Sequence, residues 1–316
     1  MDNFFHHFSL AYPLFLLVLA GYAAVRLLGL PKRLCDGLAR FAFAVALPAM
    51  LFRLMSNFSK LPPVDWRLLL AFFGACLIVF VIGRVIAWKV FGLDGVGQSV
   101  FALGGVFSNN VMLGLPMAKI VLGDAALPSA ALVIVFNALV LWTLVTVSVE
   151  LARHGSFSLR GGAKALIAVL GNPIIAAILA GTLYGLAGFG IAEPIDAALA
   201  LLGQAAAPLA LIALGMGLAA YGIRDGLRLS LCITAIKLLL QPLVVWLLAV
   251  ALALPPLETQ VVVLLASIAV GSNVYLMSRQ FGALEGAVAG SLLLSTLLSA
   301  LTTPLALAAL NWGQRP

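Results

Sequence analysis

The sequence predicts an all-α polytopic membrane protein with ten transmembrane helices in two inverted repeats of five, in which helices four and nine are broken. Three observations predict this fold class. The chain is 64% hydrophobic and only 9% charged, with a mean hydropathy of +1.18, so most of its surface must face lipid. Its apolar stretches match the roughly 20 residues that cross a bilayer. Finally, prolines, glycines and polar residues recur in the same order in both halves.

The predicted spans are separated by short polar segments or by Pro and Gly. They lack the period-two alternation that indicates the strands of a membrane barrel. The N-terminal Met1-Asp2-Asn3 has no basic residues, and no small-residue cleavage site follows, so we expect the first span to be retained. In order, the spans are 10–29, 36–56, 67–91, 97–122, 127–150, 164–188, 196–220, 228–253, 259–281 and 286–310.

The basic residues between the spans predict the orientation of the chain. With the N-terminus outside, twelve Lys and Arg residues fall on the cytoplasmic side and five on the other. Because positive charge is enriched in cytoplasmic loops, we expect both termini to lie outside. The net charge of +7 is spread thinly over these loops, so it predicts topology and no nucleic-acid partner.

The second half of the chain aligns with the first at an offset of 160 residues, and spans four and nine align at an offset of 164. Because each half holds an odd number of spans, the second half enters the membrane from the opposite side, which makes the repeats inverted. We therefore expect a first repeat at 1–152, a cytoplasmic linker at 153–163 and a second repeat at 164–316. The aligned residues are Pro13 with Pro173, Ala20-Gly21 with Ala180-Gly181, Asp36 with Asp196, Pro48 with Pro208, and Ser108-Asn109 with Ser272-Asn273.

Two short polar breaks, 107–110 and 271–273, interrupt spans four and nine at matching positions. Unpaired backbone is tolerated at membrane depth only where it is buried in protein or lines a cavity, so the breaks predict a binding site and favour a transporter. The helix that begins after a break points the positive end of its dipole at the site, which favours an anion. The alternative is that these small and polar residues only pack helices together.

The candidate site residues offer polar groups or relax the helix at the two breaks. Asn side chains both donate and accept hydrogen bonds, while Tyr275 either supplies a hydroxyl or only packs. Pro116 disfavours helix at the residue before it, and the glycines relax the backbone. The candidate substrate-binding residues are Ser108, Asn109, Asn110, Ser272, Asn273, Tyr275 and Lys237, and the candidate crossover or hinge residues are Gly105, Gly114, Pro116 and Gly271.

Lys237 is the one basic residue that lies deep within a predicted span, the eighth. An ionisable group at that depth is costly and functional by default. It either attracts an anionic substrate or acts as a tethered cation that replaces a coupling ion. The alternatives are snorkelling and pairing with a backbone carbonyl, such as one freed by Pro242. No Asp or Glu lies near the middle of a span, so the sequence offers no carboxylates for a proton relay through the membrane. Backbone carbonyls and Asn oxygens can still hold sodium.

The chain lacks the motifs of enzymes and metalloproteins. It has no His-Glu-x-x-His, no Cys/His set with metal-ligand spacing and no phosphate-binding Gly-Lys-Ser/Thr loop. Ser108 and Ser272 have only amides near them in sequence, whereas a serine nucleophile needs a base. Cys35, Cys76 and Cys232 have no paired spacing and are interpreted as buried thiols. We expect no enzymatic activity, metal or cofactor, with sodium or proton coupling left open.

The chain resembles the auxin efflux carrier family of bacterial and plant permeases over nearly its whole length. It departs from many members at Gly271-Ser272, where they carry proline. The resemblance rests on LPAMLF at 47–52, SNNVMLGLP at 108–116, GD at 123–124, KLLLQP at 237–242, NVYLMSRQFG at 273–282, and STLLS at 295–299 with Pro304.

This resemblance implies a scaffold of spans one, two, six and seven and a moving domain of spans three to five and eight to ten. The broken helices four and nine would cross, with Asn109, Asn110 and Asn273 around an organic anion such as malonate or malate. It also implies a homodimer formed through the scaffold helices. The short linker is similar to the bacterial branch, which implies the bacterial inner membrane with both termini periplasmic.

The sequence therefore predicts a secondary or potential-driven transporter of a small organic anion, a dicarboxylate such as malonate or malate, which works in the lipid bilayer by an elevator-type movement. Two alternatives stay open. One is a sodium-coupled symporter like the bile-acid carriers, which sodium-dependent binding would identify. The other is a membrane receptor that senses a metabolite without transporting it. A soluble output domain, or a separate partner that provides one, would identify such a receptor.

Overall fold

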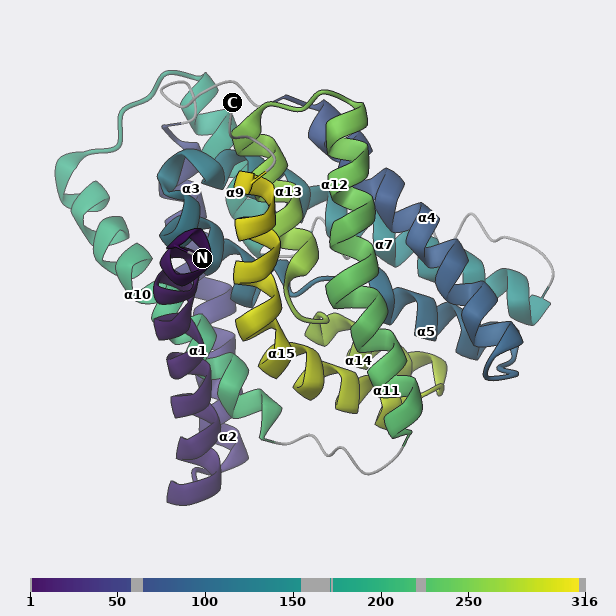
Figure 1. The fold of residues 1–316 in the computed structure, drawn as a ribbon. Coiled ribbons are helices and arrows are strands. Elements are labelled where there is room, and N and C mark those ends of the chain that lie inside the picture. Colours follow the sequence, from purple (N-terminus) through teal and green to yellow (C-terminus); the bar gives the residue numbers. More distant parts are fainter. Residues whose placement is uncertain (1, 58–64, 155–170, 172, 220–225, 313–316) are drawn as a thin grey trace.

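The computed structural model describes residues 2–57, 65–154, 171, 173–219 and 226–312. These residues form helices joined by short loops (Figure 1), and no β-strand occurs among them. The helices of the first half are α1 (Asp2–Leu28), α2 (Lys32–Phe41), η1 (Ala42–Ala46), α3 (Leu47–Met55), α4 (Arg67–Lys89), α5 (Gly95–Val106), η3 (Asn110–Gly114), α6 (Leu115–Met117), η4 (Ala118–Leu122), η5 (Asp124–Ala126) and α7 (Leu127–His154). Those of the second half are α9 (Pro173–Leu186), α10 (Glu193–Leu218), α11 (Leu227–Ala235), η6 (Ile236–Leu240), α12 (Gln241–Ala251), α13 (Pro256–Ser267), α14 (Ser272–Phe281) and α15 (Glu285–Trp312).

Long apolar helices make the chain a multi-pass membrane protein. Within the described ranges, seven helices are long and apolar enough to cross a bilayer. They are Phe8–Leu28, Arg33–Met55, Arg67–Lys89, Asp124–Arg153, Glu193–Leu218, Leu227–Ala251 and Glu285–Leu310. Shorter apolar helical segments accompany them at Gly95–Val106, Asn110–Leu122, Pro173–Leu186 and Pro256–Ser267.

Each predicted span overlaps an observed helix, but spans four, six and nine are not single long helices. Span four is divided into α5 and a helical segment from Asn110 to Leu122, and span nine into α13 and α14. The 12 residues of α5 or α13 extend only about 18 Å, short of the roughly 30 Å of hydrocarbon. For span six the structure describes α9, while the residues before Pro173 and most of the predicted linker at 153–163 lie outside the described residues.

Three prolines, Pro48, Pro116 and Pro242, each follow a π-helical turn by two residues, namely η1, η3 and η6. Proline has no N–H to donate, and its ring clashes with the carbonyl four positions earlier, so a wider turn before it relieves the clash. Although proline disfavours helix at the residue before it, Leu115 is helical here. Helical backbone runs from Asn110 to Leu122, and Pro116 lies inside it, in α6.

The helices form two sets, which lie largely on opposite sides of the view in Figure 1. The first set comprises α1, α2, η1, α3, α9 and α10, which pack on one another. The second comprises α4, α5, α7 and α11 to α15 with the short segments η3 to η6. The sets meet where α15 packs on α1, where α7 contacts α3 and α9, and where η3 contacts α10.

Two glycines allow close helix packing within the first set. A Cβ on Gly21 of α1 would lie 2.1 Å from the carbonyl oxygen of Ile212 in α10, and one on Gly181 of α9 would lie 2.6 Å from that of Phe52 in α3. A side chain at either position would push the helices apart. Gly21 and Gly181 are 160 residues apart in sequence, and so are Phe52 and Ile212, so the two contacts correspond under the alignment of the halves.

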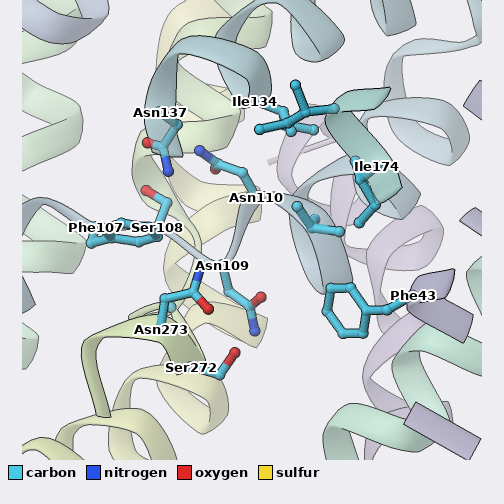
Figure 2. A pocket seen from close by; sticks show the side chains of 13 residues that line it. Phe43, Phe107, Ser108, Asn109, Asn110, Ile134, Asn137, Ile174, Ser272 and Asn273 are labelled. Atoms are coloured by element: carbon cyan, nitrogen blue, oxygen red, sulfur yellow. The ribbon is translucent and has the colours of Figure 1, made fainter. Parts of the chain in front are cut away.

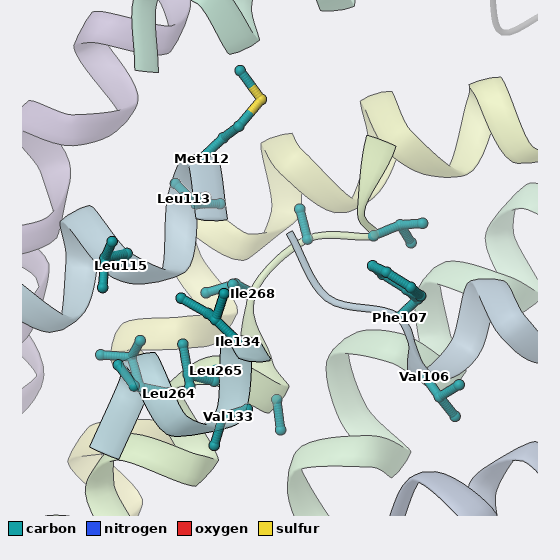
Figure 3. Packing of buried hydrophobic residues seen from close by; sticks show 14 of the residues in the cluster. Val106, Phe107, Met112, Leu113, Leu115, Val133, Ile134, Leu264, Leu265 and Ile268 are labelled. Atoms are coloured by element: carbon teal, nitrogen blue, oxygen red, sulfur yellow. The ribbon is translucent and has the colours of Figure 1, made fainter. Parts of the chain in front are cut away.

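Apolar side chains pack around the two helix breaks. Figure 3 shows the two extended segments running past each other, with Val106 and Phe107 on one side and Leu265 and Ile268 among the residues on the other. These four side chains are at most 3% exposed. Close packing of this kind fixes the extended backbone in one conformation.

Candidate binding site at two crossing helix breaks

The first break follows α5. This helix ends at Val106, after which Phe107 has φ −85° and ψ 104°, and Asn109 has φ −78° and ψ 57°, so neither continues the helix. Helical backbone resumes at Asn110. The break therefore comprises residues 107–109, within the predicted 107–110.

The second break starts three residues before its predicted start at residue 271. Helix α13 ends at Ser267, Ile268 is extended with ψ 169°, and α14 begins at Ser272 after the N-cap residue Gly271. The unwound segment is thus 268–271. Ser272 and Asn273, expected to be part of the break, instead form the first turn of α14.

The two breaks cross and pair through their backbones. The Asn109 N–H donates to the Ala269 carbonyl at 2.9 Å, and the Gly271 N–H donates to the Phe107 carbonyl at 2.8 Å. The pairing is antiparallel. Each break thereby satisfies part of the backbone that the other leaves unpaired, which is the condition for unwound chain inside a membrane.

Gly271 permits this close approach. A Cβ at this position would lie 2.9 Å from Cδ1 of Phe107 and 3.0 Å from the carbonyl oxygen of Ser108. By contrast, Gly105 and Gly114, expected as hinge residues, lie inside α5 and η3. There a Cβ would meet neighbouring side chains at 2.6 Å and 2.8 Å, so these two glycines serve packing.

The half-helices α5 and α13 both end at the crossing, and side chains from a neighbouring helix bind their last carbonyls. Lys237 in η6 donates its ammonium to the Ala266 carbonyl. Gln241, one turn later, donates Nε2 to the Val106 carbonyl at 2.9 Å. Since the carboxyl end of a helix carries partial negative charge, the Lys237 ammonium also offsets the dipole of α13.

Helix α15 supports the second break from another side. Thr303 Oγ1 donates to the Ser267 carbonyl at 2.9 Å, and the Val270 N–H donates to Ser295 Oγ at 3.0 Å. All four residues are buried. The unwound segment is therefore bound on both sides by hydrogen bonds, which preorganises the crossing.

A cavity of about 200 Å³ lies beside the crossing, between the two sets of helices. It is smaller than the roughly 300–1,000 Å³ of a drug-sized ligand pocket, so it fits a compact ligand. Figure 2 shows the Asn side chains of both breaks on one side and Phe43 and Ile174 across from them. The lining residues are Phe43, Phe107, Ser108, Asn109, Asn110, Val111, Ile134, Asn137, Ile174, Ile175, Gly271, Ser272 and Asn273.

Several buried polar atoms of the lining have no hydrogen-bond partner in the structure. They are Ser108 Oγ, Asn109 Nδ2, both side-chain polar atoms of Asn110, and Asn137 Oδ1. All four residues are at most 5% exposed. A buried polar group left unpaired costs about 1–3 kcal/mol, so this concentration in one cavity indicates a site that is completed by a ligand or by water.

The cavity lies at the amino-terminal ends of η3 and α14. The first backbone N–H groups of a helix have no partner within it, and the helix dipole adds positive potential there. None of the lining side chains is charged. Positive potential from two helix ends, together with Asn amide donors, favours an anion with several oxygen acceptors.

The structure brings most of the predicted binding residues together. Ser108, Asn109, Asn110, Ser272 and Asn273 line the cavity. Tyr275 and Lys237 do not belong to its lining; Tyr275 lies in α14, and Lys237 is fully buried in η6. The sequence reasoning missed Asn137 and the apolar wall Phe43, Val111, Ile134, Ile174 and Ile175. The signal for Asn137 was a polar residue in the middle of an apolar span.

A family model described as "Membrane transport protein" matches residues 7–307. The chain belongs to the auxin efflux carrier family. This carrier is also 28% identical over 306 residues to a "Putative malonate transporter" of Rhizobium meliloti (strain 1021), a match that covers 93% of this chain and 92% of the relative. Membership in a transport family makes the protein described here a transporter and not an enzyme.

Proposed function

We propose that this protein is a secondary transporter of a small organic dianion, such as malonate or malate, which binds in the cavity beside the crossing. The single observation that carries the proposal is the set of unpaired buried groups on Ser108, Asn109, Asn110 and Asn137, next to two helix amino termini. The carboxylates accept from the amide and backbone N–H groups, and Asn oxygens bind their hydration water. The malonate in the name of the Rhizobium meliloti relative supports this class of substrate.

The mechanism that we propose is an elevator movement of one set of helices against the other. The scaffold is the set containing α1, α2, α3, α9 and α10, and the transport domain is the set containing the crossing. Support comes from the position of the cavity, whose lining includes Phe43 and Ile174 from the first set and Asn109, Asn137 and Asn273 from the second. A ligand held there would move with the transport domain and change sides of the membrane.

Ten spans in two inverted repeats belong to the same proposal. The matched packing of Gly21 on Ile212 and of Gly181 on Phe52 supports it, since both contacts follow one offset. We further propose that the protein is a homodimer formed through scaffold helices, in a bacterial inner membrane with both termini periplasmic. The excess of basic residues in alternate loops supports this orientation.

Charge sets the direction of unassisted transport. Moving one elementary charge across 100 mV is worth about 2.3 kcal/mol, so a membrane that is negative inside drives net efflux of the anion. Uptake requires exchange or a coupled cation.

A binding experiment tests the substrate class. Purified protein in detergent is titrated with malonate, with its monomethyl ester and with glutarate, and thermal unfolding is followed. A ligand that binds only the folded state raises the melting temperature in a concentration-dependent way. We expect malonate to raise it most, because the ester loses one carboxylate and glutarate holds its two carboxylates two methylene groups further apart than malonate does. Equal shifts from all three, or none from malonate, would contradict the proposed substrate.

A further inference from the structure

The unpaired polar atoms of the cavity include hydrogen-bond acceptors as well as donors. Among the described residues, Asn109 Nδ2 and Asn110 Nδ2 are buried donors without a partner, and Asn110 Oδ1 and Asn137 Oδ1 are buried acceptors without one. Ser108 Oγ also lacks a partner and can act as either. Asn110 is 2% exposed and Asn137 is 5% exposed. A ligand that satisfies the cavity must therefore donate hydrogen bonds as well as accept them.

The side chains of Asn110 and Asn137 lie together at the cavity wall. Asn110 begins η3 after the first break, and Asn137 lies in α7. Figure 2 shows the Asn110 side chain directed toward Asn137. Both polar atoms of Asn110 lack a partner in the part of the chain that the structure describes. Turning this amide by 180° would therefore leave one donor and one acceptor to be satisfied in either orientation.

A carboxylate satisfies only the donors of this cavity. An ionised carboxylate accepts hydrogen bonds and donates none, so bound malonate leaves the Asn137 oxygen to a water molecule. A hydroxyl group both donates and accepts. A hydroxyl on the carbon chain of a dicarboxylate can replace that water, donating to Asn137 Oδ1 and accepting from Asn110 Nδ2. Such a ligand avoids the entropy cost of holding an ordered water.

We propose that Asn137, together with Asn110, recognises a hydroxyl group on the substrate, so that the cavity binds 2-hydroxydicarboxylates more tightly than the same dicarboxylates without the hydroxyl. This recognition rests on the proposed function, because it concerns the substrate of the same cavity. It makes Asn137 a specificity-determining residue. The Asn109 amide and the two helix amino termini serve the carboxylates of both kinds of ligand.

Two pairs of ligands that differ by one hydroxyl group test this recognition. Tartronate is malonate with a hydroxyl on its central carbon, and malate is succinate with a hydroxyl on its chain. Isothermal titration of the purified protein in detergent measures the affinity for each. We expect tartronate to bind about tenfold more tightly than malonate, because a buried acceptor without a direct partner in the complex weakens binding. One enantiomer of malate is expected to exceed succinate by a similar factor.

Asn137→Leu removes the amide and keeps a side chain of similar size. In this variant we expect tartronate and malonate to bind within about twofold of each other, and the two malate enantiomers to become equal. The enantiomers carry the same charge, so a difference between them reports where the hydroxyl is bound. Asn109→Ala is the matched comparison, because it removes a donor from the same cavity. It is expected to weaken both members of a pair by a similar factor and to keep their ratio.

Three outcomes would count against this recognition. Equal binding of tartronate and malonate by wild type would reject it and leave the proposed function standing, since malonate still binds. A preference for tartronate that persists in folded Asn137→Leu would also reject it, because the hydroxyl would be bound elsewhere. If Asn137→Leu does not fold, Asn137→Ala is measured in its place and judged in the same way. If folded wild type binds none of the four dicarboxylates, the proposed function fails and the hydroxyl recognition fails with it.

Discussion

At the scale of single residues, the binding site is defined by amides that have nothing to bind within the protein. Asn109 and Asn110 come directly from the sequence reasoning, because Asn in an apolar span needs a partner. Asn137 follows the same rule, but it lies in a span without a helix break and was not singled out. Tyr275 and Lys237 were singled out, yet neither lines the cavity. Where a side chain on a short helix points depends on long-range packing, which local sequence does not encode.

Asn109→Ala removes a cavity-lining amide and leaves the Asn109 backbone hydrogen bond in place. Loss of a hydrogen bond to a charged ligand costs about 1.5–3 kcal/mol, so we expect malonate binding to weaken by roughly tenfold to a hundredfold. Isothermal titration in detergent measures the change. Asn57→Ala is the control, because Asn57 binds the Arg53 carbonyl outside the cavity. Equal affinity of Asn109→Ala and wild type would remove Asn109 from the site.

Gly271→Ala places a methyl group 3.0 Å from the Ser108 carbonyl oxygen in a crossing that cannot easily open. Overpacking of this kind typically costs about 1–3 kcal/mol, so we expect a lower melting temperature and weaker malonate binding. Gly217→Ala is the matched control, since a Cβ on this α10 glycine would meet nothing within 4 Å. If both variants have the same melting temperature as wild type, the crossing is not closely packed at Gly271.

At the scale of elements, the sequence predicts the helices well and the second break less well. Gly271, Ser272 and Asn273 are residue types that favour the start of a helix, and they mark the beginning of α14 rather than the unwound segment. The unwound segment 268–271 is mostly apolar and carries no local signal of its own. It is extended because it pairs with the other break, a contact between residues about 160 positions apart in sequence.

A covalent link between the two sets of helices tests whether they move relative to each other. In a protein with its three native cysteines replaced by Ala, Val111→Cys in η3 and Ile174→Cys in α9 place one cavity-lining thiol on each set of helices. We expect a short bis-thiol reagent to stop exchange, because the link joins scaffold to transport domain.

Met50→Cys with Gly203→Cys provides the control link within the scaffold. A Cβ on Gly203 would lie 3.5 Å from that of Met50, a distance that permits a disulfide. Exchange is expected to continue after oxidation of this pair, so no reduction is needed to restore it. A carrier that works normally with residues 111 and 174 linked would rule out the elevator movement.

At the scale of the whole molecule, a neutral cavity lies at the boundary of two helix sets in a membrane protein. Two helix amino termini face this cavity, while Lys237 and Gln241 bind the carbonyls at the two carboxyl ends. The crossing thus leaves net positive potential on the cavity side. The sequence predicts both breaks and both pairs of half-helices. Packing determines which helix ends have their partial charge offset by a side chain and which helix ends face the cavity.

A neutral cavity predicts electrogenic transport of a dianion. Two negative charges crossing 100 mV correspond to about 4.6 kcal/mol, so an imposed potential that is positive inside should accelerate malonate uptake into proteoliposomes. A potassium gradient with valinomycin sets the potential, and radiolabelled malonate measures the rate. A rate that does not change with the sign of the potential would indicate charge compensation by a coupled cation.

Counterflow tests the central claim most directly. Proteoliposomes loaded with unlabelled malonate receive radiolabelled malonate outside, in sodium-free and sodium-containing buffer, with protein-free liposomes and Asn109→Ala alongside. We expect saturable accumulation by wild type that is the same in both buffers, at least about tenfold slower in Asn109→Ala, and absent without protein. A folded wild-type protein that accumulates no malonate in either buffer would contradict the assignment of this cavity as a malonate transport site.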